Sequence, residues 1–156
     1  MARIQATASA VIDAPAAAAY GILTDYRHGH PRILPPRYFS GLEVERGGTG
    51  AGTVIHFRMH ALGATRTLRA EISEPEPGRT LVETYLGSGE VTTFTVEPLE
   101  GGGRCRVTIL TEWTSRGFAG MVERLLVPPL LRRIFAEELD NLARCAARPT
   151  ESGAGA

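Results

Sequence analysis

The chain contains no lysine: arginine supplies every basic charge, and 17 basic and 17 acidic residues give a net charge of zero. The absence of lysine excludes a Schiff base to a substrate or pyridoxal cofactor, a P-loop phosphate clamp and a kinase-type lysine. Nucleic-acid-binding domains usually carry a basic excess. We therefore expect no DNA partner.

Cysteine is scarce, since only Cys105 and Cys145 occur, far apart and outside any Cys-x-x-Cys spacing. Two distant cysteines exclude a disulfide framework and a zinc ribbon. No spacing of histidines and carboxylates supplies a set of metal ligands. We expect neither a metal nor another cofactor.

Long apolar runs are also missing. The first 15 residues lack the apolar core of a secretory signal, and the longest strictly apolar run, residues 125–131, contains Pro128 and Pro129. A membrane-spanning helix needs about 20 residues. We expect a cytoplasmic protein with reduced thiols and no stable membrane insertion, either a monomer or a homodimer.

The length of 156 residues and the apolar share of 43% suit one globular domain. No internal repeat is present. The last residues are small and polar, which is typical of a disordered end. We expect a single domain over residues 1–147 and a disordered tail over residues 148–156.

Periodicity and turn residues predict the order of the elements. Residues 3–12 alternate as a strand, and residues 15–23 have helical spacing behind a cap at Asp13 and Pro15. The prolines of residues 25–39 leave room for a short helix and a loop. Six segments rich in Val, Ile, Thr and aromatics follow, each bounded by Gly or Pro: residues 41–46, 53–61, 64–74, 79–87, 90–99 and 104–114.

Short connections between these six segments predict antiparallel neighbours. The glycine-rich residues 47–52 join two strands and lack the GxGxxG spacing, so we interpret them as a hairpin turn and not a phosphate loop. Residues 118–147 have apolar side chains at helical spacing. Pro128 and Pro129 predict a break or kink in this helix, followed by about 18 helical residues, roughly 27 Å.

The predicted fold class is α+β: a seven-stranded curved antiparallel sheet wrapped around a long C-terminal helix, with two short helices after the first strand. A sheet of this size twists and curls. One helix cannot fill its concave face. We therefore expect an internal hydrophobic cavity.

Turn and cap motifs recur in a defined order: IDAP at 12–15, LTDY at 23–26, GAGT at 50–53, EPEPGR at 74–79, TFTVEP at 93–98 and EELDNL at 137–142. In these motifs residues 3–147 resemble the START/SRPBCC superfamily, whose helix-grip fold is shared with the birch-pollen-allergen proteins. Within it the chain looks most like bacterial polyketide cyclase/dehydrase-like proteins. The resemblance implies the fold but not one function, because the superfamily includes carriers, aromatase/cyclases, quinone-binding proteins and ribosome-associated toxins.

Inward-facing apolar side chains are the predicted ligand contacts. In strand 53–61, Phe57 and Met59 share the apolar face, while His56, Arg58 and His60 occupy a face that we interpret as solvated. The indole N–H of Trp113 needs a partner when buried and could orient a ligand. The predicted apolar contacts are Phe57, Met59, Phe94, Trp113, Leu131 and Phe135.

The polar candidates depend on how strand 79–87 is oriented, and two arrangements remain open. In one, Leu81, Glu83 and Tyr85 face inward, so that a carboxylate and a phenol lie in an apolar cavity. Burial there would raise the pKa of Glu83 and suit acid–base work. In the other, Val82, Thr84 and Leu86 face inward, and Glu83 and Tyr85 are surface residues.

Three further polar residues are candidates. Arg66 faces inward near the end of its strand and could anchor a ligand together with Tyr85, or reach out to water. His28 and His30 follow the first helix, close to where a helix-grip fold has its cavity mouth. Either histidine could act as an acid or base, and the alternative is a solvated loop.

We interpret the chain as a module that binds a small hydrophobic ligand, such as a polyketide, lipid, steroid or quinone-like molecule. The alternative is a polyketide aromatase/cyclase-type enzyme for aldol cyclisation and dehydration, with Glu83, Tyr85, His28 or His30 as acid–base groups. No compact constellation comparable to a triad is present, which leaves open whether the chain is an enzyme. A second alternative is a ribosome- or protein-interacting module.

Overall fold

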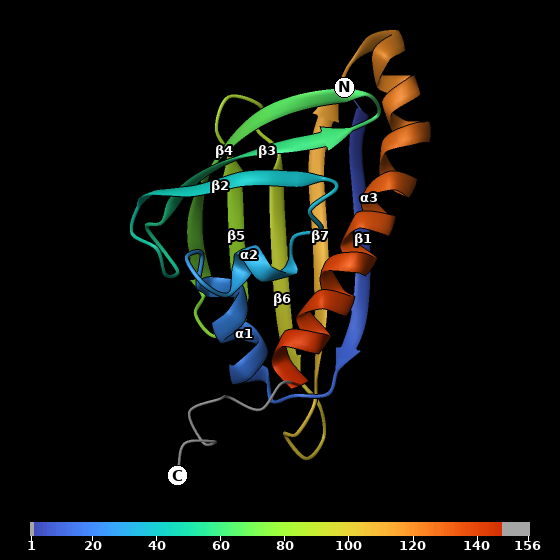
Figure 1. Ribbon diagram of the computed structural model, residues 1–156. Helices are drawn as coiled ribbons and strands as arrows, with labels where there is room; N and C mark the ends of the chain where they lie inside the picture. Colours follow the sequence, from blue (N-terminus) through green and yellow to red (C-terminus); the bar gives the residue numbers. More distant parts are fainter. Residues whose placement is uncertain (1, 148–156) are drawn as a thin grey trace.

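The computed structural model describes residues 2–147 (Figure 1). The predicted tail, residues 148–156, lies outside the described residues. Within residues 2–147 the chain forms seven strands and three helices. In chain order these are β1 Ala2–Ile12, α1 Ala16–Thr24, α2 His30–Ile33, β2 Phe39–Arg46, β3 Val54–Ala61, β4 Ala64–Glu76, β5 Thr80–Tyr85, β6 Val91–Pro98, β7 Cys105–Ser115 and α3 Gly117–Ala147.

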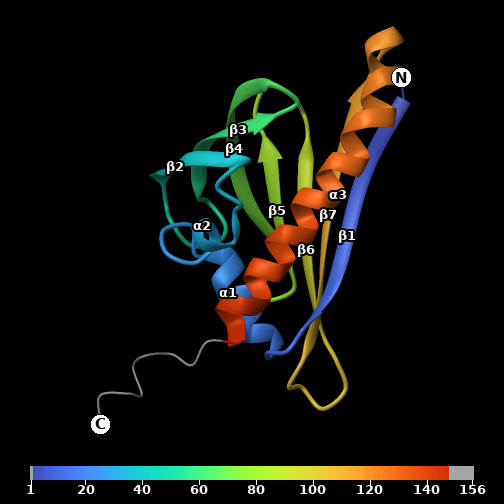
Figure 2. The same cartoon turned by 45° about the vertical axis from the view of Figure 1, so that its right-hand side comes forward.

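All seven strands form one sheet in the order β1-β7-β6-β5-β4-β3-β2, and each neighbouring pair is antiparallel. Strands β2–β7 are therefore a meander, and β1 closes it beside β7. Figures 1 and 2 show β2, β3 and β4 curling over while α3 runs lengthwise beside β1. The predicted α+β architecture, with two short helices after β1, is confirmed.

The hydrophobic core lies between the concave face of the sheet, α1, α2 and the C-terminal half of α3. Ile134, Leu139 and Leu142 of α3 are fully buried, as are Val107 and Ile109 of β7. In contrast, the first turns of α3 are exposed, and Phe118 has 80% of its surface accessible. The helix is thus fixed by its second half, and its first half extends along the open end of the sheet (Figure 2).

Of the break or kink predicted in α3, the break is absent, because the helix is continuous through Pro128 and Pro129. Each proline lacks an N–H, so the carbonyls of Arg124 and Leu125, four residues earlier, lose their helical donors. Arg124 and Leu125 both lie on the exposed part of the helix. Water can bind these carbonyls there, and the helix continues past the prolines.

The glycine-rich residues 47–52 connect β2 to β3, as the hairpin interpretation requires. Gly50 has a φ of 63°, and a Cβ there would collide with the carboxylate of Glu74. That carboxylate accepts hydrogen bonds from the backbone N–H of Ala51 (2.7 Å) and from the hydroxyl of Tyr20 (3.1 Å). Burial raises the pKa of Tyr20 to about 12, and the hydrogen bond and charge of Glu74 are the second cause. The loop is a tight structural connection.

Cys105 and Cys145 are both free. No helix within residues 2–147 combines the length and the apolar character needed to cross a membrane.

Candidate functional site

A cavity of about 560 Å³ lies between α3 and the inner face of the curved sheet. Its walls come from β2 to β7, from α3, and from the α2 region at one side. Cavities of 300–1,000 Å³ are typical of sites for small molecules. The internal cavity predicted from the architecture is therefore present.

All eight predicted ligand contacts border this cavity: Phe57, Met59, Arg66, Tyr85, Phe94, Trp113, Leu131 and Phe135. The aromatic rings of Phe39, Phe57 and Tyr85 meet edge to face, with ring centroids 5.8 and 6.2 Å apart. Such contacts give the cavity a firm apolar wall. Contact of these residues with a ligand stays a prediction.

Two of the eight sit differently from the expectation. The indole N–H of Trp113 already donates to the carboxylate of Glu123 on α3 (3.3 Å), so it joins β7 to α3. The guanidinium of Arg66 is 55% exposed and lies 3.1 Å from Glu90. Arg66 therefore marks the rim of the cavity, which fits the alternative that it reaches out to water.

Strand β5 adopts the first of the two arrangements that its sequence allows. Leu81 and Glu83 are buried and Thr84 is exposed, while Tyr85 borders the cavity. The strand ends at Tyr85, two residues earlier than predicted. A carboxylate and a phenol thus face an apolar cavity.

Glu83 is the centre of a buried hydrogen-bond network. Its Oε1 accepts from the hydroxyl of Tyr26 (2.8 Å), and its Oε2 accepts from the hydroxyl of Tyr85 (2.7 Å). The Nε2 atom of His30 lies 3.5 Å from Oε1. Residues from the α1–α2 connection, α2 and β5 therefore converge on one carboxylate.

His30 is buried, and the alternative that placed it in a solvated loop is wrong. Its Nδ1 lies 2.7 Å from the carbonyl oxygen of Leu23. A carbonyl can only accept, so Nδ1 carries the proton in this contact. The other ring nitrogen, Nε2, faces Glu83. The ring also stacks on Tyr26, with centroids 4.5 Å apart.

Burial raises the pKa of both Tyr26 and Tyr85 well above 10, and the nearby charge of Glu83 raises them further. Desolvation and a neighbouring anion both disfavour a phenolate. The two phenols therefore stay protonated and act as donors.

Glu138 of α3 brings a second carboxyl group to the cavity. It is buried, and within residues 2–147 it has no hydrogen-bond partner. Burial raises the pKa of Glu138 well above 4.5, and the charge of Glu83 adds to this. The neutral carboxylic acid is therefore favoured. Nearby in the wall, the hydroxyls of Thr92 and Thr111 are 2.7 Å apart.

Sequence reasoning missed Tyr26 and Glu138 as site residues. A signal for Glu138 exists, because it lies three residues after Phe135 and four before Leu142 on the apolar stripe of the helix. A carboxyl on such a stripe is buried or points into a cavity. No comparable signal marks Tyr26, which lies in an irregular segment rich in Gly and Pro.

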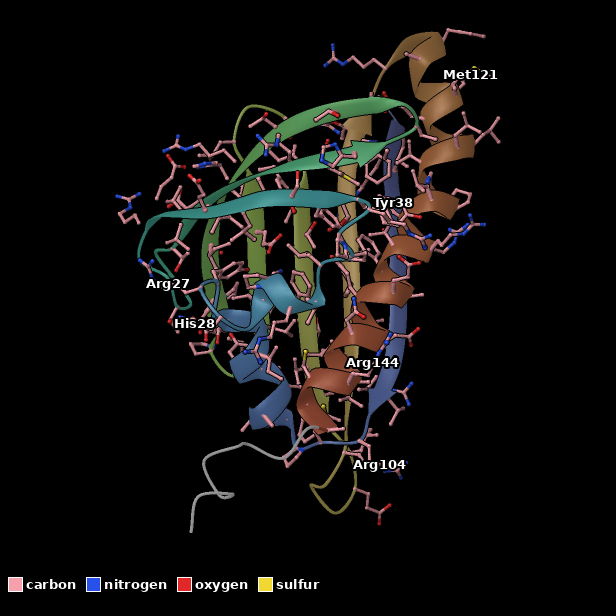
Figure 3. The ribbon with its side chains drawn as sticks, in the orientation of Figure 1. Arg27, His28, Tyr38, Arg104, Met121 and Arg144 are labelled. Atoms are coloured by element: carbon pink, nitrogen blue, oxygen red, sulfur yellow. The ribbon has the colours of Figure 1, made fainter. Side chains whose placement is uncertain are left out.

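Other candidates lie outside the cavity. His28 is 79% exposed, pairs with Asp25 at 3.7 Å and points outward from its loop (Figure 3). His56 pairs with Glu43 (3.1 Å) on the outer face of the sheet, and His60 bonds Ser40 there (2.8 Å). The interpretation of that face as solvated agrees with these positions. In the part of the chain that the structure describes, no three His, Cys, Asp or Glu side chains gather as metal ligands.

A family model described as polyketide cyclase / dehydrase and lipid transport matches residues 3–147. The KanY protein, solved by NMR, is 31% identical; the match covers 95% of this chain and all of that one, with a TM-score of 0.82. Norcoclaurine synthase from Thalictrum flavum, solved with dopamine and hydroxybenzaldehyde, is 15% identical, with coverages of 92% and 86% and a TM-score of 0.66.

A START superfamily protein from Mycobacterium smegmatis is 13% identical, with coverages of 90% and 92% and a TM-score of 0.62. At these two lower identities the likeness is one of fold. A search of curated proteins finds no match.

Proposed function

Because the chain belongs to the polyketide cyclase / dehydrase and lipid transport family, we propose that it binds a small, mostly apolar molecule in its internal cavity. Polyketide, lipid, steroid and quinone-like molecules fit this description. The observation that carries the proposal is a cavity of about 560 Å³ whose apolar walls surround one buried polar cluster. The cytoplasmic location and the monomeric or homodimeric state stay predictions of the sequence.

The walls supply affinity and the polar cluster supplies orientation. A ligand that buries about 300 Å² of apolar surface gains about 7 kcal/mol, before the costs of association are subtracted. A polar group beside this cluster, the carboxyl of Glu138, can then bind an oxygen of the ligand and set its direction. Binding requires nothing else from the chain.

Native mass spectrometry of protein purified gently from its own host tests this proposal. We expect a mass above that of the bare chain, and the released molecule identifies the ligand. A bare mass, with no uptake from a panel of lipids, steroids, quinones and polyketides, would contradict it.

A pair of neighbouring substitutions locates the binding. Met59 borders the cavity, while Arg58 is exposed on the opposite face of β3. Met59→Trp fills empty space and should abolish uptake, whereas Arg58→Trp adds the same ring outside and should leave uptake unchanged. Equal uptake by both variants would place the ligand elsewhere.

A second candidate function is cyclisation of a polyketide-like chain, favoured by acid–base groups inside an apolar cavity. Nε2 of His30, 3.5 Å from Glu83, would take a proton from the carbon beside a ketone. The resulting enolate carbon would form a bond to a second carbonyl of the same molecule, and Glu138 would protonate the alkoxide. Loss of water from the aldol would follow.

Glu83→Gln and Glu138→Gln separate the two functions. An enzyme would keep ligand binding in these variants and lose the cyclised product, measured by mass spectrometry of the reaction. A binding protein would yield no product even with the wild-type chain.

A further inference from the structure

The cavity interior differs in charge from its rim. The interior carries two carboxyl groups, on Glu83 and Glu138. Arg66 is the one arginine among the described lining residues; it is 55% exposed and paired with Glu90. An anionic ligand group that reached the interior would therefore meet carboxyl groups and no guanidinium.

Glu138 is the interior group whose hydrogen-bonding capacity is unused. Both oxygens of Glu83 accept from phenols, whereas Glu138 has no partner within residues 2–147 and is only 4% exposed. Among these residues every fully buried side-chain oxygen or nitrogen is bonded. The carboxyl oxygens of Glu138 therefore border the cavity.

An unpartnered carboxyl beside another carboxylate in an apolar wall is unfavourable as an anion. As a neutral acid it presents one O–H donor to the cavity. We propose that Glu138 donates this hydrogen bond to an uncharged carbonyl oxygen of the ligand, and so selects ketones, esters or quinones over carboxylates. The proposal rests on the proposed function and narrows its ligand class.

The same geometry disfavours ligands that carry another group in place of the carbonyl. A carboxylate would be repelled by Glu83 and, among the described lining residues, would find no interior guanidinium to replace its lost water. An ammonium would have to compete with the hydroxyls of Tyr26 and Tyr85 for the oxygens of Glu83. An aliphatic group in the same place would leave the donor of Glu138 unsatisfied.

Four naphthalenes of matched shape test the proposal by isothermal titration calorimetry: 2-acetylnaphthalene, 2-naphthoate, 2-naphthylmethylamine and 2-ethylnaphthalene. The wild-type chain should bind the ketone about tenfold more tightly than each of the other three, which is the effect of one buried hydrogen bond.

Substitutions at Glu138 test whether its carboxyl group causes the preference for the ketone. Glu138→Gln keeps a neutral donor and should keep the preference for the ketone. Glu138→Leu removes the donor and should bind the ketone and 2-ethylnaphthalene equally. Glu137→Gln is the matched control, because Glu137 forms an ion pair with Arg37 and is not among the residues that line the cavity; it should behave as wild type.

The preference for the ketone, measured at several pH values, distinguishes a donor role of Glu138 from a merely structural one. Glu83 and Tyr85 of β5, His30 of α2, Glu90 and Glu123 also line the cavity. Once Glu138 ionises at high pH, the wild-type chain should lose its preference for the ketone, whereas Glu138→Gln, with the same neighbours, should keep it.

Equal binding of the ketone and 2-naphthoate, tighter binding of the amine, or an unchanged preference in Glu138→Leu would overturn the proposal while ligand binding itself stands. Binding of none of the four by a folded wild-type chain would overturn the proposed function and this inference together.

Discussion

Glu83 shows what a buried carboxylate requires of its neighbours. No arginine of residues 2–147 reaches the interior, and the two oxygens of Glu83 accept from the hydroxyls of Tyr26 and Tyr85. Burial and Glu83 keep both phenols protonated, so each donor is permanent. The same residue that could contact a ligand thus ties the α1–α2 connection to β5.

Tyr26→Phe should therefore destabilise the protein although it removes only one oxygen. The substitution leaves Oε1 of Glu83 with His30 as its remaining neighbour, and the loss of a buried donor costs about 1–3 kcal/mol. Urea unfolding measures this. Tyr38→Phe, which removes a hydroxyl without a hydrogen bond in the described chain, should stay within about 0.5 kcal/mol of wild type. Similar losses in both variants would contradict the role of the network.

Glu138 should make stability fall as the pH rises. In the unfolded chain its carboxyl ionises near 4.5, while its pKa in the folded protein is raised well above that value. Above pH 4.5 the folded protein thus retains a proton that the unfolded chain has released, and each further pH unit costs about 1.4 kcal/mol until Glu138 ionises.

Glu138→Gln removes this titration and leaves the other side chains of the cavity unchanged. The unfolding free energy of wild type minus that of the variant, from urea titrations at several pH values, should therefore decline as the pH rises. Glu137→Gln should follow the wild-type curve. A difference that stays constant with pH would show that Glu138 keeps its ordinary pKa.

The sequence predicts part of this residue-scale arrangement. Alternation identifies Phe57 and Met59 as inward, because only one face of their strand is apolar. It cannot orient strand 79–87, where both faces mix apolar and polar residues. The convergence of Tyr26, His30 and Glu83 depends on tertiary contacts between segments more than 50 residues apart, which no local pattern encodes.

At the scale of elements, the positions of Gly and Pro predict the strands of the sheet better than they predict the course of the C-terminal helix. Gly and Pro mark the strand ends, and the hairpin at residues 47–52 follows from its glycines. Of the break or kink expected at Pro128 and Pro129, the break is absent. The local rule for proline considers only the lost hydrogen bond. In the folded protein, packing of Phe135, Leu139 and the residues around them fixes the axis of the second half of the helix, and the preceding turns continue along that axis.

Pro129→Ala should stabilise the first half of α3. Position 129 is exposed, and alanine restores an N–H donor for the carbonyl of Leu125. We expect a gain of about 1–2 kcal/mol, because proline costs up to about 3 kcal/mol inside a helix and part of this is offset in the unfolded chain. Hydrogen exchange of residues 118–127 should slow accordingly.

Arg132→Ala, at another exposed position of the same helix, is the control and should leave this exchange within about twofold of wild type. Unchanged exchange in Pro129→Ala would mean that the missing donor does not limit the stability of the segment.

At the scale of the molecule, one helix against a seven-stranded sheet decides where empty space remains. The second half of α3 fills the core beside β1 and β7, and the strands that curl over at β2, β3 and β4 stand away from it (Figures 1 and 2). The cavity occupies this gap. The existence of the cavity follows from element order and sheet curvature, whereas its polar lining depends on single residues.

A ligand that occupies the cavity of the folded chain should raise the free energy of unfolding. A molecule that binds only the folded chain stabilises it by about 2.7 kcal/mol at a free concentration 100 times its Kd. For a domain of this size that corresponds to a rise in Tm of about 5–10 °C. We therefore expect 2-acetylnaphthalene to raise the Tm of wild type and Arg58→Trp by this amount, measured by circular dichroism. The Tm of Met59→Trp should not respond, because the added ring occupies the ligand's space; an equal rise in that variant would place the stabilising site outside the cavity.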